Sequence, residues 1–158
     1  MELLLVLGLV AMLMFLAVPM FQNLLQSTLQ QEVNRISGVI RLLRNEAVLT
    51  NSRYRLMLAL KESRYFVERQ LPDGSYETVQ DPRVLSPHSF PSDMRLQTLL
   101  LLGHIYRADK TEPLPVVVDA SGYIDPFLLH FTVADQDYTL RVAGFTGRVE
   151  LEEGRVER

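Results

Sequence analysis

An uninterrupted apolar stretch near the start of this 158-residue chain constrains its fold more than any other feature. Between Glu2 and Gln22 there is no charged residue. A helix from Leu3 to Phe21 would be roughly 28 Å long at about 1.5 Å of rise per residue, which is close to the hydrocarbon thickness of a bilayer. The sequence therefore predicts a membrane-spanning helix over residues 1–22, with Leu3 and Phe21 near its two ends.

Two residues distinguish this stretch from an ordinary membrane anchor. Glu2 places a carboxylate at the edge of the apolar segment, where a charge is costly, so we interpret it as a functional residue with a cationic partner. Pro19 lacks an N–H donor and clashes with the preceding turn, so we expect it to loosen or kink the helix near Phe15 to Pro19. The simpler interpretations are that Glu2 is an interfacial flanking charge and that Pro19 is an incidental kink.

A cleavable secretory signal is the main alternative for this segment. Such a signal needs a basic region, a shorter apolar stretch and a small-residue cleavage site, yet no Lys or Arg precedes Arg35. The helical pattern instead continues past Pro19, because apolar residues recur at three- and four-residue steps: Leu25, Leu29, Val33, Ile36, Ile40, Leu43 and Ala47. We therefore expect one long helix that ends near Thr50–Ser52, with an amphipathic part over residues 23–51.

Composition limits the chemistry and the partners of the chain. Cysteine is absent, which excludes disulfides, zinc–thiolate sites and thiol nucleophiles. The net charge is −3 and the arginines are scattered, so a nucleic-acid partner is not indicated. Glutamates also dilute the arginines near the C-terminus, which are Arg141, Arg148, Arg155 and Arg158. The positive-inside rule would place the arginine-bearing side of the anchor in the cytoplasm, unless a basic segment precedes the anchor.

After the helix, the apolar period changes from 3.6 to 2, which indicates β-strands. Residues 81–93 contain three prolines and indicate an irregular loop, whereas residues 96–106 fit either a strand pair or a short helix. The strands are expected at residues 54–60, 65–71, 76–79, 116–118, 127–133, 138–142 and 148–151.

Alternation within residues 127–133 predicts one buried and one exposed face of a sheet. Leu129, Phe131 and Val133 are expected to be buried, and His130 and Thr132 are expected to be exposed. Residues 52–158 are therefore predicted to form a β-rich domain. Because neither apolar face can be buried alone, its antiparallel sheet should pack against the amphipathic helix in an α+β fold.

No residue pattern indicates an enzyme, a cofactor or a metal site. The three histidines, His88, His104 and His130, fall in separate predicted segments without the spacing of metal ligands. Asp119, Ser121 and Asp125 form an oxygen-rich cluster that lacks the spaced ligands of a calcium loop, so a hairpin turn is the better interpretation. Residues 144–148 (GFTGR) are likewise interpreted as a turn between the last two strands.

The start of the chain resembles the N-terminal motif of type IV pilins and type II secretion pseudopilins. Glu2, the apolar span after it and Pro19 match that motif, including the spacing from glutamate to proline. The motif usually reads Gly-Phe-Thr-Leu, then Met or Ile, then Glu. Met1 resembles the residue before this glutamate, so the resemblance implies that three mature residues and a basic leader precede it. A prepilin peptidase would remove this leader from the longer precursor, and the globular domain would then lie in the periplasm.

Three further segments resemble the H-type minor pseudopilin, GspH, and its relative FimT. These are residues 42–49 (LLRNEAVL), residues 116–126 (VVVDASGYIDP) and residues 144–149 (GFTGRV). The resemblance implies a pilin-like fold and a structural subunit of the periplasmic pseudopilus, anchored in the inner membrane by one span. Its partners would be the major pseudopilin and other minor pseudopilins. Glu2 and Pro19 would serve assembly, because Glu2 would neutralise the N-terminal amine of a neighbouring subunit and Pro19 would let the helix adapt to the fibre core.

Two alternatives remain open at this point. A FimT-like minor pilin would help to prime a type IV pilus or take up DNA, which requires Arg141, Arg148, Arg155 and Arg158 to form one basic face. A bitopic membrane protein would use the sheet domain to bind a ligand or envelope partner without polymerising. The consequence of replacing Glu2 distinguishes a polymerising subunit from this last alternative.

Overall fold

A computed structural model describes residues 2–80 and 85–156, with the side chains of the first helix described at residues 6–8, 12 and from 27 onward. The chain forms two compact units, Met1–Glu32 and Val33–Arg158. Residues 2–32 of the first unit lie within helix α1 (Glu2–Thr50), and the second unit contains the last turns of α1 and all the described strands.

In the first unit, α1 continues through Pro19, so this proline does not end the helix. Where side chains are described, Val6, Leu7 and Met12 are exposed. Over the described part of the chain, no helix is long and apolar enough to span a membrane.

In the second unit, one face of α1 is buried. Val33, Ile36, Val39, Ile40, Leu43 and Ala47 are all less than a tenth exposed, which confirms the amphipathic stripe for this part of the helix. The helix ends at Thr50, within the expected range, because Asn51 adopts a left-handed conformation with φ of 48°. The Ser52 N–H donates to the Ala47 carbonyl at 3.2 Å, which satisfies one of the free carbonyls of the last turn.

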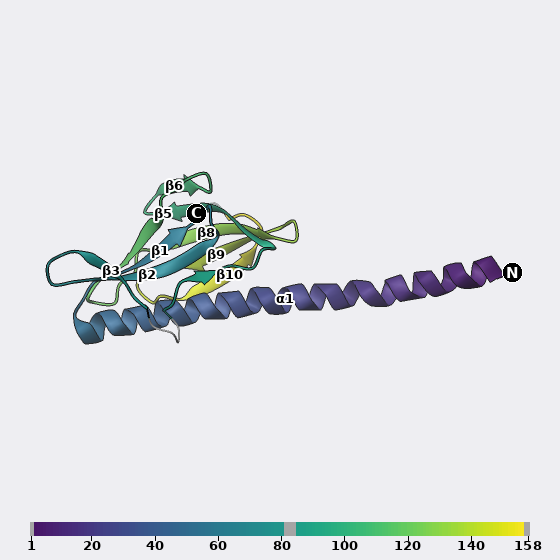
Figure 1. The fold of residues 1–158 in the computed structure, drawn as a ribbon, viewed down its shortest axis with the longest axis horizontal. Helices are drawn as coiled ribbons and strands as arrows, with labels where there is room; N and C mark the ends of the chain where they lie inside the picture. The colour runs from purple at the N-terminus through teal and green to yellow at the C-terminus, as the bar shows by residue number, and fades with distance from the viewer. Residues whose placement is uncertain (1, 81–84, 157–158) are drawn as a thin grey trace. The chain divides into compact units, whose positions relative to one another are not determined.

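The described strands form two antiparallel sheets, whereas the sequence suggested one (Figure 1). The first has the order β3-β2-β1-β7, and β4 also pairs with β2. Its predicted meander is confirmed, because β1 pairs antiparallel with β2 and β2 with β3. The strands are β1 (Tyr54–Ala59), β2 (Arg64–Gln70), β3 (Tyr76–Thr78), β4 (His88–Ser89) and β7 (Leu114–Val118).

The second sheet has the order β10-β9-β8-β5-β6, with every neighbouring pair antiparallel. Residues 94–107 form a hairpin rather than a helix, which decides the alternative that the sequence left open. The strands are β5 (Met94–Leu101), β6 (His104–Arg107), β8 (Phe127–Val133), β9 (Gln136–Val142) and β10 (Val149–Glu153). The inner faces of both sheets and the buried stripe of α1 supply the apolar residues of the core.

Two details of the sequence analysis are wrong. The loop expected at residues 81–93 contains the short strand β4, held because His88 and Ser89 pair with β2. His130, expected to be exposed, is only 6% exposed. It lies on the central strand β8, where Thr98 and Thr139, its cross-strand neighbours, are buried with it.

Thr139 explains how a polar group is accommodated beside His130. Its hydroxyl donates to the Gly154 carbonyl at 2.7 Å and accepts from the Val156 N–H at 3.2 Å. His130 Nδ1 lies 2.9 Å from the same oxygen. Since the single hydroxyl proton is already donated, Nδ1 carries the proton of this pair and donates to Thr139. The cluster ties residues 154–156 to the sheet.

Replacement of Thr139 by valine tests this cluster. Thr139→Val keeps the side-chain shape but removes the acceptor for two donors, so the free energy of unfolding should fall by about 1–3 kcal/mol. Urea unfolding of the purified chain in detergent measures this change. Thr132→Val on the adjacent strand is the control and should change stability by less than about 0.5 kcal/mol. Equal losses in the two variants would contradict the assigned role of Thr139.

Candidate functional site

The side chains of the site residues expected from the sequence lie outside the described part of the structure. This applies to Glu2 and Pro19, the expected assembly residues, and to Leu3 and Phe21, the expected ends of the membrane span. Their roles remain predictions. The candidate site that the structure does describe is in the second unit, where α1 meets two loops of the β-rich domain.

Arg44 of α1 joins these loops with its whole guanidinium group. Its Nε donates to the Gly122 carbonyl at 2.6 Å, and Nη2 donates to the Phe145 carbonyl at 2.8 Å. Nη1 donates to the Thr146 carbonyl. Because a planar guanidinium presents its donors in a fixed fork, one side chain can orient both loops relative to the helix. Arg44 lies within residues 42–49, which resemble the H-type pseudopilins, but no pattern in the sequence predicts this role.

The two glycines of residues 144–147 are required by this arrangement. Gly147 has φ of 63°, and a Cβ added there would lie 2.6 Å from Arg44 Cδ. A Cβ at Gly144 would lie 2.8 Å from the Ile124 carbonyl oxygen. The Ile124 N–H also donates to the Gly144 carbonyl at 3.2 Å, which joins the two loops directly. Residues 144–148 thus form the turn expected from the sequence. Its conformation also depends on contacts with Arg44 of α1.

The joined loops present an aromatic side chain to solvent. Phe145 is 86% exposed, and its ring packs edge-on against Tyr123 with centroids 5.7 Å apart. Val48 on α1 is also exposed and lies beside Gly122, where an added Cβ would be 3.0 Å from its Cγ2. We call Val48, Tyr123 and Phe145 the aromatic patch.

A rigid, exposed aromatic residue of this kind suits protein recognition. Clusters of large, exposed apolar side chains are uncommon on monomeric proteins, and such clusters mark interaction surfaces. Phe145 is held by its backbone rather than by burial of its ring, so the ring stays available for a partner. The segment GFTGR indicates a turn from its sequence alone. Its contact with α1 could not be predicted in this way, because Arg44 is about a hundred positions away in the sequence.

Among the described C-terminal arginines, two are paired with carboxylates rather than free to form the basic face that DNA binding would require. Arg141 pairs with Glu152 at 3.1 Å, and Arg148 pairs with Glu150 at 3.0 Å. Arg155 is exposed, whereas Arg158 lies outside the described residues. The carboxylates of β10 therefore offset the arginine charges next to them.

The oxygen-rich cluster at residues 119–125 is a turn, as predicted. Asp119 Oδ1 accepts hydrogen bonds from the Ser121 N–H, the Ser121 hydroxyl and the Tyr123 N–H at 2.8, 2.6 and 3.2 Å. The Ser121 hydroxyl is the main reason that the pKa of the Asp119 carboxyl lies below its ordinary value. Asp125 Oδ2 accepts from the Val117 N–H at 3.1 Å. These carboxylates are engaged by the protein itself.

The histidines fall on three different strands. His88 lies on β4, His104 on β6 and His130 on β8. Within the described ranges, no group of three or more histidine, aspartate or glutamate side chains is placed to hold a metal ion.

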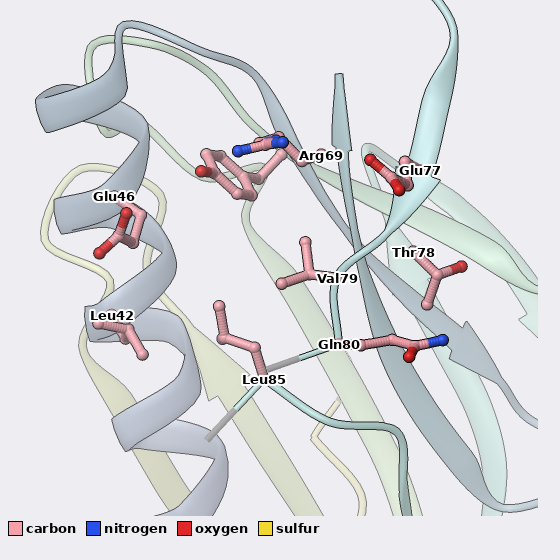
Figure 2. A pocket seen from close by; sticks show the side chains of 9 residues that line it. Leu42, Glu46, Arg69, Glu77, Thr78, Val79, Gln80 and Leu85 are labelled. Carbon is pink, nitrogen blue, oxygen red and sulfur yellow. The ribbon is translucent and has the colours of Figure 1, made fainter. Parts of the chain in front are cut away.

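A hollow of about 640 Å³ lies between α1 and the edge of the first sheet (Figure 2). Glu46 and Leu42 face it from the helix, and Arg69 and Glu77 face it from β2 and β3. Its lining combines charged groups with apolar side chains such as Leu42 and Leu85. Residues 81–84, between the lining residues Gln80 and Leu85 in the sequence, lie outside the described residues.

The comparisons with known proteins agree with this architecture. No family model matches the sequence, and no curated protein matches it. A solved structure of the minor pseudopilin EpsH from the type 2 secretion system of Vibrio cholerae is similar, with a TM-score of 0.65 and 18% identity, over 82% of this chain and 99% of that one. The chain has the fold of a minor pseudopilin. A second structure of EpsH gives a TM-score of 0.65 and 17% identity, over 80% of this chain and 96% of that one.

Replacing Arg44 tests whether it organises the aromatic patch of this pseudopilin fold. Arg44→Lys keeps the charge but cannot bond three carbonyls at once, so we expect a loss of about 1.5–3 kcal/mol in the free energy of unfolding. Urea unfolding measures the loss. Gly147→Ala should also destabilise, because its Cβ overlaps the Arg44 side chain. Arg41→Lys, an exposed arginine on the same helix, is the control and should change stability by less than about 0.5 kcal/mol.

Proposed function

We propose that the chain is a minor pseudopilin, a structural subunit of the periplasmic pseudopilus that takes part in protein secretion by the type II secretion system. The observation that carries this proposal is the likeness of its fold to EpsH over nearly the whole length of that chain. The N-terminal motif with Glu2 and Pro19 is a second line of support, because it is a pattern in the sequence rather than a likeness of fold.

In this proposal, the first part of the chain anchors the subunit in the inner membrane, and the β-rich domain lies in the periplasm. Leu3 to Phe21 would pass from lipid into a core of apolar helices with little change in solvation, since both surroundings are apolar. Glu2 would neutralise the N-terminal amine of a neighbouring major or minor pseudopilin, because a carboxylate in an apolar region needs a cationic partner. Pro19 would weaken the helix locally and let it fit the fibre.

The aromatic patch would then contact another pseudopilin. Its three residues come from α1 and the two loops that Arg44 joins, so the patch has a fixed shape before binding. A preformed surface loses less conformational entropy on association than a mobile one. This assigns the GFTGR turn a role in assembly rather than in catalysis.

The FimT-like alternative with DNA uptake is not favoured. Two of the four arginines that it requires are paired with glutamates on β10. The non-polymerising alternative predicts that Glu2 is dispensable for association with other subunits, so it is tested by the same variant as the main proposal.

Glu2→Ala should abolish incorporation into pseudopilus fibres and leave membrane insertion intact. Without the carboxylate, the amine of the neighbouring subunit would stay uncompensated in an apolar core. Sheared fibres and membranes from cells that overproduce the major pseudopilin are compared by immunoblotting. Glu2→Asp keeps the charge and is the matched control. Normal fibre incorporation of Glu2→Ala would refute the pseudopilin proposal and support a non-polymerising membrane protein.

Phe145→Ser should reduce fibre incorporation while changing the free energy of unfolding by less than about 0.5 kcal/mol, because the ring is almost fully exposed. The same immunoblot measures incorporation, and urea unfolding measures stability. Lys61→Ser changes an exposed residue in the turn after β1, outside the patch, and serves as the control. Equal incorporation of Phe145→Ser and the unmodified chain would show that the aromatic patch has no part in assembly.

A further inference from the structure

The second sheet ends in a free edge at β6. β6 pairs with β5 on one side, and no described strand pairs with it on the other. In Figure 1, β6 is the strand of this sheet that lies farthest from α1. Unpaired backbone groups at a sheet edge are a template for another strand, and proteins usually protect such edges with charged residues, prolines or bulges.

The hairpin turn determines which backbone groups of β6 point outward. Leu102 and Gly103, with φ of 50° and 82°, form a two-residue turn between the paired residues Leu101 and His104. The pair that flanks such a turn is hydrogen-bonded, and the next pair is not. Ile105 opposes Leu100 in that next pair. The N–H and C=O of Ile105 therefore point away from β5 and are available to a new strand.

Two of the side chains at this edge are apolar and exposed. Ile105 is 68% exposed and Leu102 is 61% exposed. Leu102 also occupies the left-handed region, which is unfavourable for a residue with a branched side chain, and its side chain gains no burial in return. The fold alone does not explain these two residues.

The apolar edge continues onto the outer face of the sheet. Ile105 lies beside Leu100, and Leu100 lies beside Leu128 on β8. Beyond Leu100 and Leu128 there is a hollow of about 360 Å³, which is also lined by Leu102 and Pro126. This row of residues would pack against an apolar side chain carried by an added strand.

The charge at the edge limits what that strand can be. Arg107 lies two residues after Ile105, so both side chains project from the outer face. It is exposed and has no ion pair with any described residue. His104 is also exposed, and β6 contains no acidic residue; Asp109 and Glu112 lie beyond its end. An acidic residue two positions from an apolar one on the added strand would match this pattern.

We propose that β6 binds an extended segment of another protein of the fibre, in which an apolar residue faces Ile105 and an acidic residue faces Arg107. The main chain of Ile105 would supply the hydrogen bonds, and the two side chains would supply the selectivity, as in other cases of strand addition. The inference rests on the proposed function for the identity of the partner as a fibre component.

A second copy of this chain does not fit the edge as well. Antiparallel pairing of β6 with β6 relates the copies by a twofold axis normal to the sheet, so residues 33–50 of the two helices would run in opposite directions. Subunits anchored in one membrane share a single direction. Self-pairing would also bring together two strands that both lack acidic residues.

Binding is tested with two short blocked peptides and the full chain in detergent micelles. The first peptide is Thr-Thr-Val-Thr-Glu-Thr, in which valine and glutamate lie on one face of a strand; the control peptide has lysine in place of glutamate. The acidic peptide should slow hydrogen exchange of the Ile105 amide, measured by NMR. It should bind about two- to fivefold more tightly than the lysine peptide, as expected for one exposed ion pair.

Two variants identify the contacts. Ile105→Pro removes the outward N–H, is compatible with an edge strand, and should abolish the binding of both peptides. Arg107→Glu should reverse the preference, so that the lysine peptide binds more tightly. Arg95→Glu, an exposed arginine on the neighbouring strand β5, is the matched control and should leave the preference unchanged.

Three results would overturn the inference: no protection of Ile105, equal binding of the two peptides, or protection that grows with protein concentration in the absence of peptide. The last result would mean that a second copy occupies the edge. Each result is independent of the Glu2→Ala fibre test, so failure at β6 is distinguishable from failure of the pseudopilin proposal.

Discussion

The guanidinium group of Arg44 is the interaction on which the arrangement of the β-rich domain around α1 depends. It reaches from the helix to the carbonyls of residues 122, 145 and 146, which belong to the two loops that follow β7 and β9. Carbonyl groups in loops need donors when they face the protein, and three of them are satisfied here by one side chain. The position of Phe145, the close approach of Gly147 and the contact of Tyr123 with Phe145 follow from it.

The apolar core explains why this arrangement needs both the helix and the sheets. The buried face of α1 consists of aliphatic residues, and the sheets supply facing residues such as Leu129 and Leu140. Burial of each apolar square ångström contributes about 25 cal/mol, so neither surface is stable when it is left open to water. The polar cluster of His130 and Thr139 is compatible with burial because the Thr139 hydroxyl is hydrogen-bonded as a donor and as an acceptor.

Two surfaces remain for partners once the core is formed, and they differ in chemistry. The aromatic patch offers a preformed apolar surface near the end of α1, whereas β6 offers main-chain groups beside Ile105 and Arg107. A subunit that contacts more than one neighbour needs more than one such surface. The patch residues come from α1 and the loops after β7 and β9, whereas the free edge belongs to the β5–β6 hairpin, so each surface can be altered without disturbing the other.

Several features could be predicted because they depend on local periodicity. The end of the helix near Thr50, the meander of β1 to β3 and strand β8 were all predicted from residue spacing. Residues 96–106 could not be decided, since a short apolar run fits a helix or a strand pair until its neighbours are known. His130 was expected on the exposed face because alternation was counted on one strand, while its burial comes from the neighbouring strands β5 and β9.

The order and period of residues along the chain were enough to predict the long helix, the β-rich domain that follows it and the resemblance of its first residues to pilins. The division into two sheets, the role of Arg44 and the free edge at β6 became apparent only in the folded chain. The hydrogen bond between Arg44 and Phe145 joins residues 101 positions apart, so local spacing cannot predict it. A free edge can be identified only when the order of the strands is known. Local patterns fix which elements form, whereas contacts between distant residues fix which surfaces remain exposed.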